Sequence, residues 1–271
     1  MTSKSPPNRR QVLAGGIASA MMLGAGKLTR PAQASVQTSQ SKYPVVVELF
    51  TSQGCSSCPP ADALLGQLAE RADVVSLAYH VDYWDRLGWK DPFSSSWATE
   101  LQTGYSRRHR RRNNYTPQMI VDGEVDVIGS RRKSVMKTVE DQLAKAAHEP
   151  RVIVDLTPGG DRRGDLRGNP GDDRIAVDLS GMTENVEAEV LLLRFDKQHR
   201  TQIGRGENRG RTLDYHHVVR ERRVLGRWRG EAIGFRVPPP AEPNSGLAVL
   251  VQERNFGPII GAGQLLFKQS A

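Results

Sequence analysis

The stretch from Val45 to Tyr79 constrains the fold of this chain most strongly, because it reads as a strand, a helix and a second strand. Val45–Phe50 and Val74–Tyr79 are short apolar runs rich in β-branched residues, as buried strands are. Between them, leucines recur at helical spacing within Ala61–Ala72. A strand, a helix and a strand in this order predict two parallel strands joined by a right-handed crossover.

The expected elements change character near residue 150. A helix within Ser94–Arg111, a hairpin around Asp122-Gly123 and a closing helix over Ser134–Ala147 complete an α/β region at residues 43–149. Residues 150–271 contain eight strand-like segments, two of them at residues 213–220 and 225–228, separated by turns rich in Gly, Pro, Asp and Asn. This pattern is typical of an antiparallel sandwich or barrel. We therefore expect an α/β domain followed by an all-β, sandwich-like domain.

The first 34 residues have the composition of an export signal. Arg9-Arg10 precedes an uncharged stretch from Ala14 to Gly26, and Ala32-Gln33-Ala34 supplies a small-residue cleavage site. Adjacent arginines favour the twin-arginine route, and the apolar run is too short to cross a bilayer comfortably. We expect export to the periplasm or beyond, a disordered leader at residues 35–42 and no membrane span in the mature chain. An ordinary secretory signal and an uncleaved anchor are the alternatives.

Removal of residues 1–34 lowers the formal charge from +8 to +3, because it leaves 33 basic and 30 acidic residues. A chain of this charge is not a polycation that attracts nucleic acid. The basic run Arg107–Arg112 lacks a recognisable motif that could read a nucleic acid. We therefore expect no nucleic-acid partner, and no feature of the sequence predicts an oligomeric state.

The chain's only cysteines, Cys55 and Cys58, lie between the first strand and its helix in the string QGCSSCPP. In an exported protein we expect them to form a disulfide with each other. The bridge closes so short a loop that it stabilises the fold little, whereas thiols at a helix start have a lowered pKa and are nucleophilic. Pro59-Pro60 fits only the first helical turn. We expect Cys55 to be the more exposed, attacking thiol and Cys58 the buried, resolving one.

His80 directly follows the second strand and is a candidate proton-transfer group beside a thiolate. The alternative is a hydrogen-bonded histidine that caps the strand. Two thiolates with His80 as a third donor could also hold Cu(I). Structural zinc requires four ligands, which two cysteines do not supply. For a redox pair we expect no metal and no cofactor.

A second motif lies far along the chain, where Thr116-Pro117 stands directly before the strand and hairpin of YTPQMIVDG. Together with the strand, the Cys-x-x-Cys turn and the helix, this motif resembles the thioredoxin fold. The strings GCSSCPPAD, HVDYWDRLGWKDPF and RGENRGRTL are similar to a secreted bacterial thioredoxin-like family, the domain of unknown function 1223. The resemblance covers nearly all of residues 43–267.

The resemblance implies further site residues. In the thioredoxin superfamily the proline beside the cysteine pair is cis, so Pro117 is expected to be cis and Thr116 to line the substrate groove. Thioredoxins also carry a buried acid on the first strand that helps to deprotonate the resolving cysteine. Glu48 stands on this strand, but the turn to the cysteines is one residue longer, so the face that Glu48 takes stays open.

Three functions fit these residues. The first is an exported thiol–disulfide oxidoreductase that acts through Cys55 and Cys58 on a protein or on a small thiol or disulfide. The second is a Cu(I)-binding or copper-delivery protein on the same scaffold. The third is a non-catalytic binding module in which the disulfide is structural. Resemblance in fold does not by itself establish an enzyme.

Overall fold

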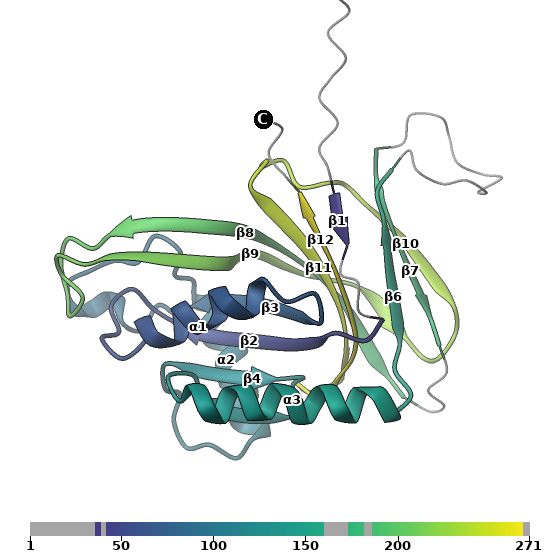
Figure 1. The fold of residues 1–271 in the computed structure, drawn as a ribbon, viewed down its shortest axis with the longest axis horizontal. Coiled ribbons are helices and arrows are strands. Elements are labelled where there is room, and N and C mark those ends of the chain that lie inside the picture. Colours follow the sequence, from purple (N-terminus) through teal and green to yellow (C-terminus); the bar gives the residue numbers. More distant parts are fainter. Residues whose placement is uncertain (1–35, 39–41, 160–172, 182–185, 268–271) are drawn as a thin grey trace, which may run out of the picture. The chain divides into compact units, whose positions relative to one another are not determined.

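The computed structural model describes residues 36–38, 42–159, 173–181 and 186–267 (Figure 1). The expected export signal at residues 1–34 lies outside the described residues. Within the expected disordered leader, Val36–Thr38 instead forms strand β1, which pairs antiparallel with β12 (Ile259–Phe267). The physical reason is that the outer strand of a sheet carries unpaired backbone groups to which one more strand can bind.

Residues 42–149 form the elements expected there, with small shifts of their ends. The first helix begins at Pro59, two residues earlier than expected, because proline is tolerated in the first helical turn. Asp122 and Gly123 have φ angles of 50° and 70°, which the tight turn of the hairpin requires. The elements are β2 (Val45–Thr51), α1 (Pro59–Ala69), β3 (Val74–His80), η1 (Asp85–Leu87), α2 (Ser96–Arg108), β4 (Gln118–Val121), β5 (Val125–Ile128) and α3 (Arg132–His148).

The described residues after 149 form strands and no helix. Two strands expected at residues 213–220 and 225–228 belong to one strand, β9, of 17 residues. The expected break is wrong because β9 continues through Glu221–Val224, where it stays paired with β8. The elements are β6 (Ile153–Thr157), β7 (Ile175–Ser180), β8 (Ala188–Gln202), β9 (Thr212–Trp228), β10 (Ile233–Val237), β11 (Ser245–Glu253) and β12.

One sheet joins the two halves of the chain. The 9-stranded sheet has the order β1-β12-β11-β8-β9-β3-β2-β4-β5, and a 3-stranded sheet has the order β10-β7-β6. β2 and β3 are parallel, as the crossover predicts, and β9 pairs with β3 at Ala78 and Val218. The fold is therefore mixed α/β around a large, mainly β sheet. The boundary expected at residues 149–150 falls just after α3, but the sheet continues across it.

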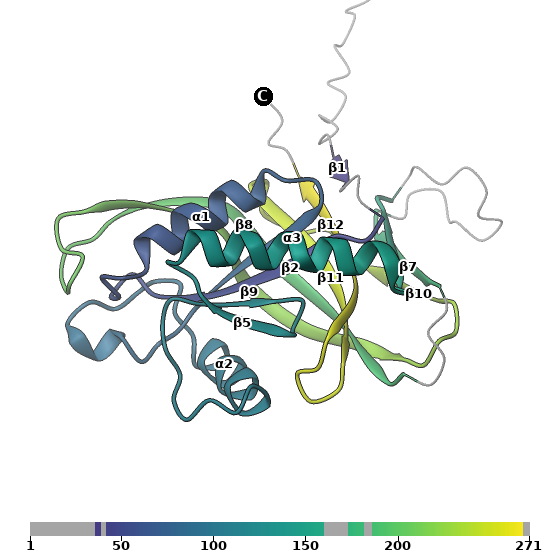
Figure 2. The same cartoon turned by 60° about the horizontal axis from the view of Figure 1, so that its bottom comes forward.

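The helices cover both faces of the strands β2 to β5 (Figure 2). Side chains alternate between the faces of a strand, so Val47 and Leu49 pack with α1 and α3 in one core. Phe50 packs with Tyr105 of α2 in a second core on the opposite face. A third core lies between the 3-stranded sheet and β8, β11 and β12. β8, β11 and β12 belong to the same 9-stranded sheet as β2 to β5, whereas the sequence predicts a separate sandwich-like domain for this region.

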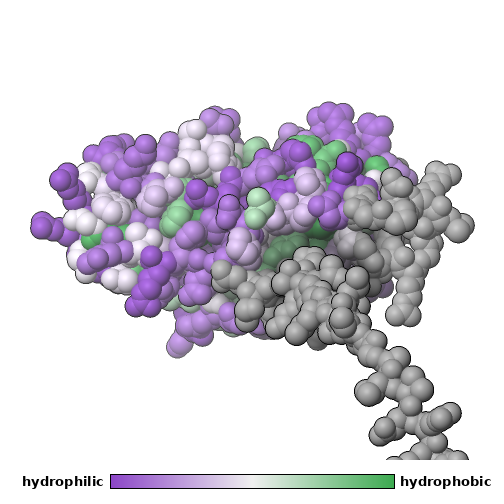
Figure 3. All heavy atoms as spheres, turned by 90° about the horizontal axis from the view of Figure 1, so that it is seen from above, coloured by the Kyte–Doolittle hydropathy of each residue, from purple (hydrophilic) through white to green (hydrophobic). Residues whose placement is uncertain are grey.

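The hairpin of β8 and β9 runs beside α1 (Figure 1). The contact is close, because a Cβ atom added at Gly66 of α1 would lie 2.6 Å from Cδ2 of His216 in β9. On the face drawn in Figure 3, hydrophilic side chains surround small hydrophobic areas. Among the described residues, the exposed large hydrophobic side chains are Leu87 and Val224. Because β8 and β9 run beside α1, the tip of their hairpin, residues 203–211, lies at the end of α1 that carries the cysteines.

Candidate functional site

Cys55 and Cys58 form a disulfide, as expected, with Cα atoms 5.4 Å apart. Cys58 is the N-cap residue of α1, and its carbonyl accepts the backbone N–H groups of Ala61 and Asp62 at 2.8 and 3.1 Å. The pair thus lies where the positive end of the helix dipole favours a thiolate. The expected difference in exposure is wrong, because both cysteines are fully buried.

A segment that lies far along the chain contacts the loop that carries the cysteines. Asn208, at the tip of the β8–β9 hairpin, donates from Nδ2 to the carbonyl oxygens of Gln53 and Cys55 at 3.0 and 2.8 Å. Glu207 accepts the N–H of Ser56 at 3.1 Å. Asn208 is itself 1% exposed. The hairpin tip therefore contacts the cysteine loop and satisfies backbone groups of Gln53, Cys55 and Ser56, while Ser56 and Ser57 stay exposed.

The Thr116–Pro117 segment approaches the cysteine loop from another direction, and its peptide bond is cis, as expected. The Ser57 hydroxyl lies 3.4 Å from Sγ of Cys55 and donates to the Thr116 carbonyl at 3.5 Å. The indole N–H of Trp84 donates to Oγ1 of Thr116 at 2.9 Å. The structure therefore brings together Cys55, Cys58, Thr116 and Pro117, which the sequence singled out separately.

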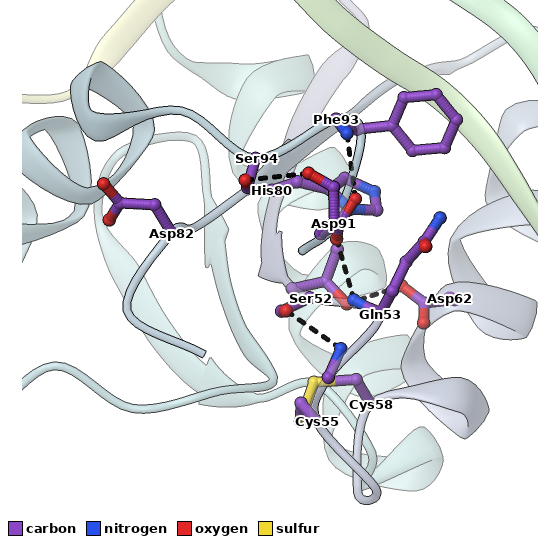
Figure 4. A network of polar contacts seen from close by, with 12 residues as sticks. Ser52, Gln53, Cys55, Cys58, Asp62, His80, Asp82, Asp91, Phe93 and Ser94 are labelled. Carbon is purple, nitrogen blue, oxygen red and sulfur yellow. Dashed lines mark hydrogen bonds and ion pairs between the residues drawn. A yellow bond between two sulfur atoms is a disulfide. The ribbon is translucent and has the colours of Figure 1, made fainter. Parts of the chain in front are cut away.

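A buried polar cluster lies beneath the cysteine loop (Figure 4). His80 and Asp91 are both buried, and Nδ1 of His80 lies 2.6 Å from Oδ2 of Asp91. The same carboxylate oxygen accepts the backbone N–H of Gln53 at 2.8 Å, two residues before Cys55. Asp62, in the first turn of α1, accepts the Thr51 hydroxyl at 2.7 Å. His80 therefore does not simply cap β3, but belongs to a network that reaches the cysteine loop.

The buried charged groups of this cluster shift one another's pKa values. Burial alone would lower the pKa of His80, but the charge and hydrogen bond of Asp91 outweigh it and raise that pKa. Burial would raise the pKa of Asp91, but His80 and the backbone N–H groups of Gln53 and Phe93 lower it. Burial raises the pKa of Asp62 to about 7, against the opposing effects of His80 and Thr51. His80 and Asp91 thus form an ion pair next to an acid that titrates near neutrality.

Glu48 does not belong to this cluster. Its carboxylate accepts the hydroxyls of Tyr79 and Tyr105, and Tyr105 stands on α2. Burial raises the pKa of Glu48, although both tyrosines oppose the shift. Since α1 covers the other face of β2, the sheet separates Glu48 from α1 and from Cys58 at its N-cap.

The residues that sequence analysis missed are Gln53, Asp62, Asp91 and Asn208. Asp62 has a signal in the sequence, because a carboxylate four positions after Cys58 falls on the same helix face as that cysteine. Asn208 has none, because its contact depends on how far the β8–β9 hairpin reaches. Polar residues close to a motif in the sequence can be predicted from it, whereas polar residues that reach the motif only through the tertiary structure cannot.

Comparison with known proteins decides the family. The model of the family described as protein of unknown function (DUF1223) matches residues 46–252. This chain belongs to the DUF1223 family. The crystal structure of protein AGR_C_4864 from Agrobacterium tumefaciens is similar to it, with 32% identity, a TM-score of 0.68 and coverage of 84% of this chain and 96% of that chain. Among curated proteins, none matches this sequence significantly.

A more distant likeness concerns the fold alone. HBP35 of Porphyromonas gingivalis aligns over 84% of this DUF1223 chain and 75% of its own, with a TM-score of 0.52 and 18% identity. Within the described part of the DUF1223 chain, no group of three or more His, Cys, Asp or Glu side chains is placed to hold a metal ion. No helix among the described residues has the length and apolar character to span a bilayer.

Proposed function

We propose that this DUF1223 protein is an exported thiol–disulfide oxidoreductase in which Cys55 and Cys58 cycle between two thiols and the disulfide. The observation that carries the proposal is the position of the pair at the N-terminus of α1, with Cys58 as the N-cap. The helix dipole stabilises a thiolate there, so the reduced pair is nucleophilic. The substrate is a disulfide or a dithiol, of a protein or of a small molecule.

The arrangement of the first half supports this proposal. The strand order β3-β2-β4-β5, with α1 and α3 on one face and α2 on the other, is what a thioredoxin-like unit requires. Thr116 lies beside the cysteine loop, where the resemblance places a groove for the substrate thiol. We propose that residues 43–149 form this unit and that residues 150–271 contribute the hairpin tip that covers the pair.

A purely structural role explains the site less well. A bridge between Cys55 and Cys58 closes a very short loop, so it restricts the unfolded chain little. The loop is also held by hydrogen bonds that Asn208 donates to it and by the Gln53 N–H, which donates to Asp91; these bonds fix its shape without a disulfide. A structural disulfide would add little stability here. A redox pair reacts more readily when its loop is fixed and acid–base groups lie nearby.

The test is a redox titration of the purified mature protein in thiol–disulfide buffers, with alkylation and mass spectrometry to count free thiols. Structural disulfides in secreted proteins have potentials below about −300 mV. A redox pair should titrate above this value, and the oxidised form should be reduced reversibly. A potential below it, together with no thiol exchange with glutathione disulfide, would show that the bridge is structural.

Single cysteine variants assign the two roles. In Cys58→Ser, the Cys55 thiolate should attack a disulfide probe and remain trapped as a mixed disulfide, because no thiol is left to resolve it. Cys55→Ser should trap less, and the double variant gives the background. If Cys58 alone traps the probe, the attacking and resolving roles are exchanged.

We also propose that the chain is exported by the twin-arginine route, so that the pair meets an oxidising compartment. The proposal rests on Arg9-Arg10 and the small-residue sequence at residues 32–34. Replacing both arginines by lysine should leave an uncleaved precursor inside the cell, as shown by fractionation and N-terminal sequencing of the full-length protein. Unchanged processing of this variant would favour the ordinary secretory route.

A further inference from the structure

Asp62 occupies a position on α1 that relates it directly to Cys58. The two residues are four positions apart, so their side chains lie on the same face of the helix, one turn from each other. That face is inward, since Cys58 is fully buried and Asp62 is 5% exposed. The turn between them is regular, with the N–H of Asp62 donating to the Cys58 carbonyl at 3.1 Å.

The carboxylate of Asp62 is only half satisfied. Oδ1 accepts the Thr51 hydroxyl at 2.7 Å, whereas Oδ2 is buried and has no hydrogen-bond partner among the described residues. A buried carboxylate oxygen without a donor is costly. A proton on Oδ2 removes the buried negative charge and so lowers this cost, which favours an acid that takes up and releases a proton.

The groups around Asp62 come from three other elements. Thr51 of β2 is the neighbour of His80 on β3, and Nε2 of His80 is a second buried atom without a partner in the described chain. Tyr215 of β9 contacts the His80 ring, and its hydroxyl is a third such atom. A groove between α1 and β9, of about 680 Å³, reaches Asp62. Its other titratable lining residues are Glu70, Arg211, Asp214 and His216.

We propose that Asp62 is the proton-transfer group for Cys58. This inference rests on the proposed redox function. When Cys55 is held in a mixed disulfide with the substrate, the Asp62 carboxylate accepts the proton of the Cys58 thiol. The Cys58 sulfur then attacks Sγ of Cys55, the Cys55–Cys58 bond forms, and the bond from Cys55 to the substrate sulfur breaks. The substrate sulfur leaves with the electron pair and takes a proton from water, so two electrons pass from the cysteine pair to the substrate.

The surrounding charges suit Asp62 to this role. Burial raises its pKa to about 7, the charge of His80 and the hydroxyl of Thr51 lower it, and the charge of Asp91 raises it again. An acid or base is most effective when its pKa lies near the working pH. Glu48, the acid expected from the sequence, is also buried with a raised pKa, but it lies on the other face of the sheet.

The experiment follows the second step of thiol exchange. Reduced protein is mixed with one equivalent of a disulfide that releases a coloured thiol from each half. The first release reports attack by Cys55, and the second reports resolution by Cys58. In Asp62→Asn, the second release near pH 7 should slow by at least about tenfold, and its pH profile should lose the inflexion near 7. The first release should be unchanged.

Two matched controls and a rescue separate proton transfer from packing. Glu48→Gln removes a buried acid on the other face, and Glu70→Gln removes an exposed acid beside the same groove; both should keep the wild-type second phase. Asp62→Glu should restore part of the rate and the inflexion. Equal second-phase rates and pH profiles in Asp62→Asn and wild type would overturn the inference. A wild-type protein that shows neither phase would overturn the proposed function instead.

If Asp62→Asn does not fold, as judged by circular dichroism, the inference is tested on the wild-type protein by infrared spectroscopy. Infrared difference spectra between oxidised and reduced protein at pH 7 should contain a protonated carboxyl band that changes on reduction, because the Cys58 thiol and Asp62 share a proton. Asp62→Glu should move this band, since it changes the carboxyl that carries the proton. A flat difference spectrum in the carboxyl region would overturn the inference.

Discussion

Asn208 donates from Nδ2 to the carbonyl oxygen of Cys55 at 2.8 Å, although 153 positions separate the two residues along the chain. The same amide group donates to the Gln53 carbonyl at 3.0 Å. A single side chain at the tip of the β8–β9 hairpin thus ties down the loop that carries the disulfide. Any reductant that reaches the disulfide has to displace this tip or pass beside it.

The first prediction concerns this contact. Asn208→Ala removes two buried hydrogen bonds, which leaves the Gln53 carbonyl without this donor and the Cys55 carbonyl with the N–H of Cys58 alone, at a cost of about 1–3 kcal/mol. The cysteine loop should therefore open more often, and reduction of the disulfide by dithiothreitol should be at least about fivefold faster. The measurement is the rate at which both cysteines become alkylated after the reductant is added.

The control for this variant is Asn244→Ala. Asn244 is an exposed asparagine whose amide also donates to a backbone carbonyl, that of Gln198, at 3.2 Å. The Asn244→Ala variant should leave the rate of disulfide reduction unchanged. An Asn208→Ala protein that is reduced at the wild-type rate would mean that the tip does not limit access to the disulfide.

The second prediction concerns stability and pH at Asp62. Burial raises the pKa of Asp62 in the folded state to about 7, well above its ordinary value of 3.8, so the folded state binds this proton more tightly than the unfolded state does. This contribution to stability is complete near pH 4 and is lost as the pH rises through 7. Oxidised Asp62→Asn should match the wild type near pH 4 and exceed it above pH 7, by up to about 4 kcal/mol.

Urea unfolding at several pH values gives this comparison. Asp73→Asn serves as a control of opposite sign, because the hydrogen bond of Arg71 lowers the pKa of Asp73; this variant should be less stable than the wild type at pH 7 and approach it in acid. A constant difference in unfolding free energy between Asp62→Asn and wild type across pH 4–8 would contradict the pKa assigned to Asp62.

The third prediction concerns the buried ion pair between Arg151 and Asp122. Their side chains are 7% and 1% exposed, and Nη2 of Arg151 lies 2.5 Å from Oδ2 of Asp122. The Asp122 carboxylate also accepts the N–H of Val46 at 2.7 Å, so the pair ties the start of β6 to β2. Arg151→Met leaves a buried carboxylate without its cation and should destabilise the protein by about 3–5 kcal/mol at pH 7.

The matched control is Arg132→Met, which removes an exposed arginine that contacts Gln67. It should change the unfolding free energy by less than about 0.5 kcal/mol. The loss in Arg151→Met should shrink in acid, because Asp122 already has a pKa raised to about 6 by burial and becomes neutral by taking up a proton. A loss that stays constant down to pH 4 would show that packing, rather than charge, accounts for it.

The fourth prediction concerns His217 on β9. Burial lowers its pKa to about 4 in the folded state, against about 6.5 when unfolded. The unfolded state therefore binds the proton more readily, and the protein should lose up to about 3 kcal/mol as the pH falls from 6.5 to 4. His217→Asn should reduce this loss, since asparagine tolerates the φ of 49° at this position and has no such proton.

Thermal and urea unfolding between pH 4 and 7 provide the test of His217. An exposed histidine, His148 at the end of α3, gives the control as His148→Asn and should keep the wild-type slope. The prediction is wrong if His217→Asn shows the same loss in acid as the wild type.

Much of the first half could be predicted because its signals are local. The apolar run of β2, the leucine spacing of α1 and the two prolines after Cys58 each specify structure within a few residues. Asp122-Gly123 specifies the hairpin because its turn needs positive φ angles. The sequence therefore predicts both the disulfide and its place at the start of α1.

The partners of these elements could not be predicted in the same way. Glu48 alternates with Val47 and Leu49 on β2, but which face it takes depends on the register with β3 and β4. The contact between Asn208 and the Cys55 carbonyl depends on the long β8–β9 hairpin, which carries Asn208 to the cysteine loop. Such contacts join distant positions, and a sequence pattern with a period of a few residues carries no information about them.

The sequence by itself determined which residues can do chemistry in this protein and which local element holds them: the cysteine pair, the helix that begins at Pro59, and the strand before it. Only the tertiary structure decided what surrounds that pair. It placed Asp62 under the cysteines and Glu48 behind the sheet, and it closed the site with a hairpin from the other half of the chain. The physical reason is that hydrogen bonding and side-chain spacing within an element are local, whereas the pairing of β3 with β9 depends on the packing of the whole sheet.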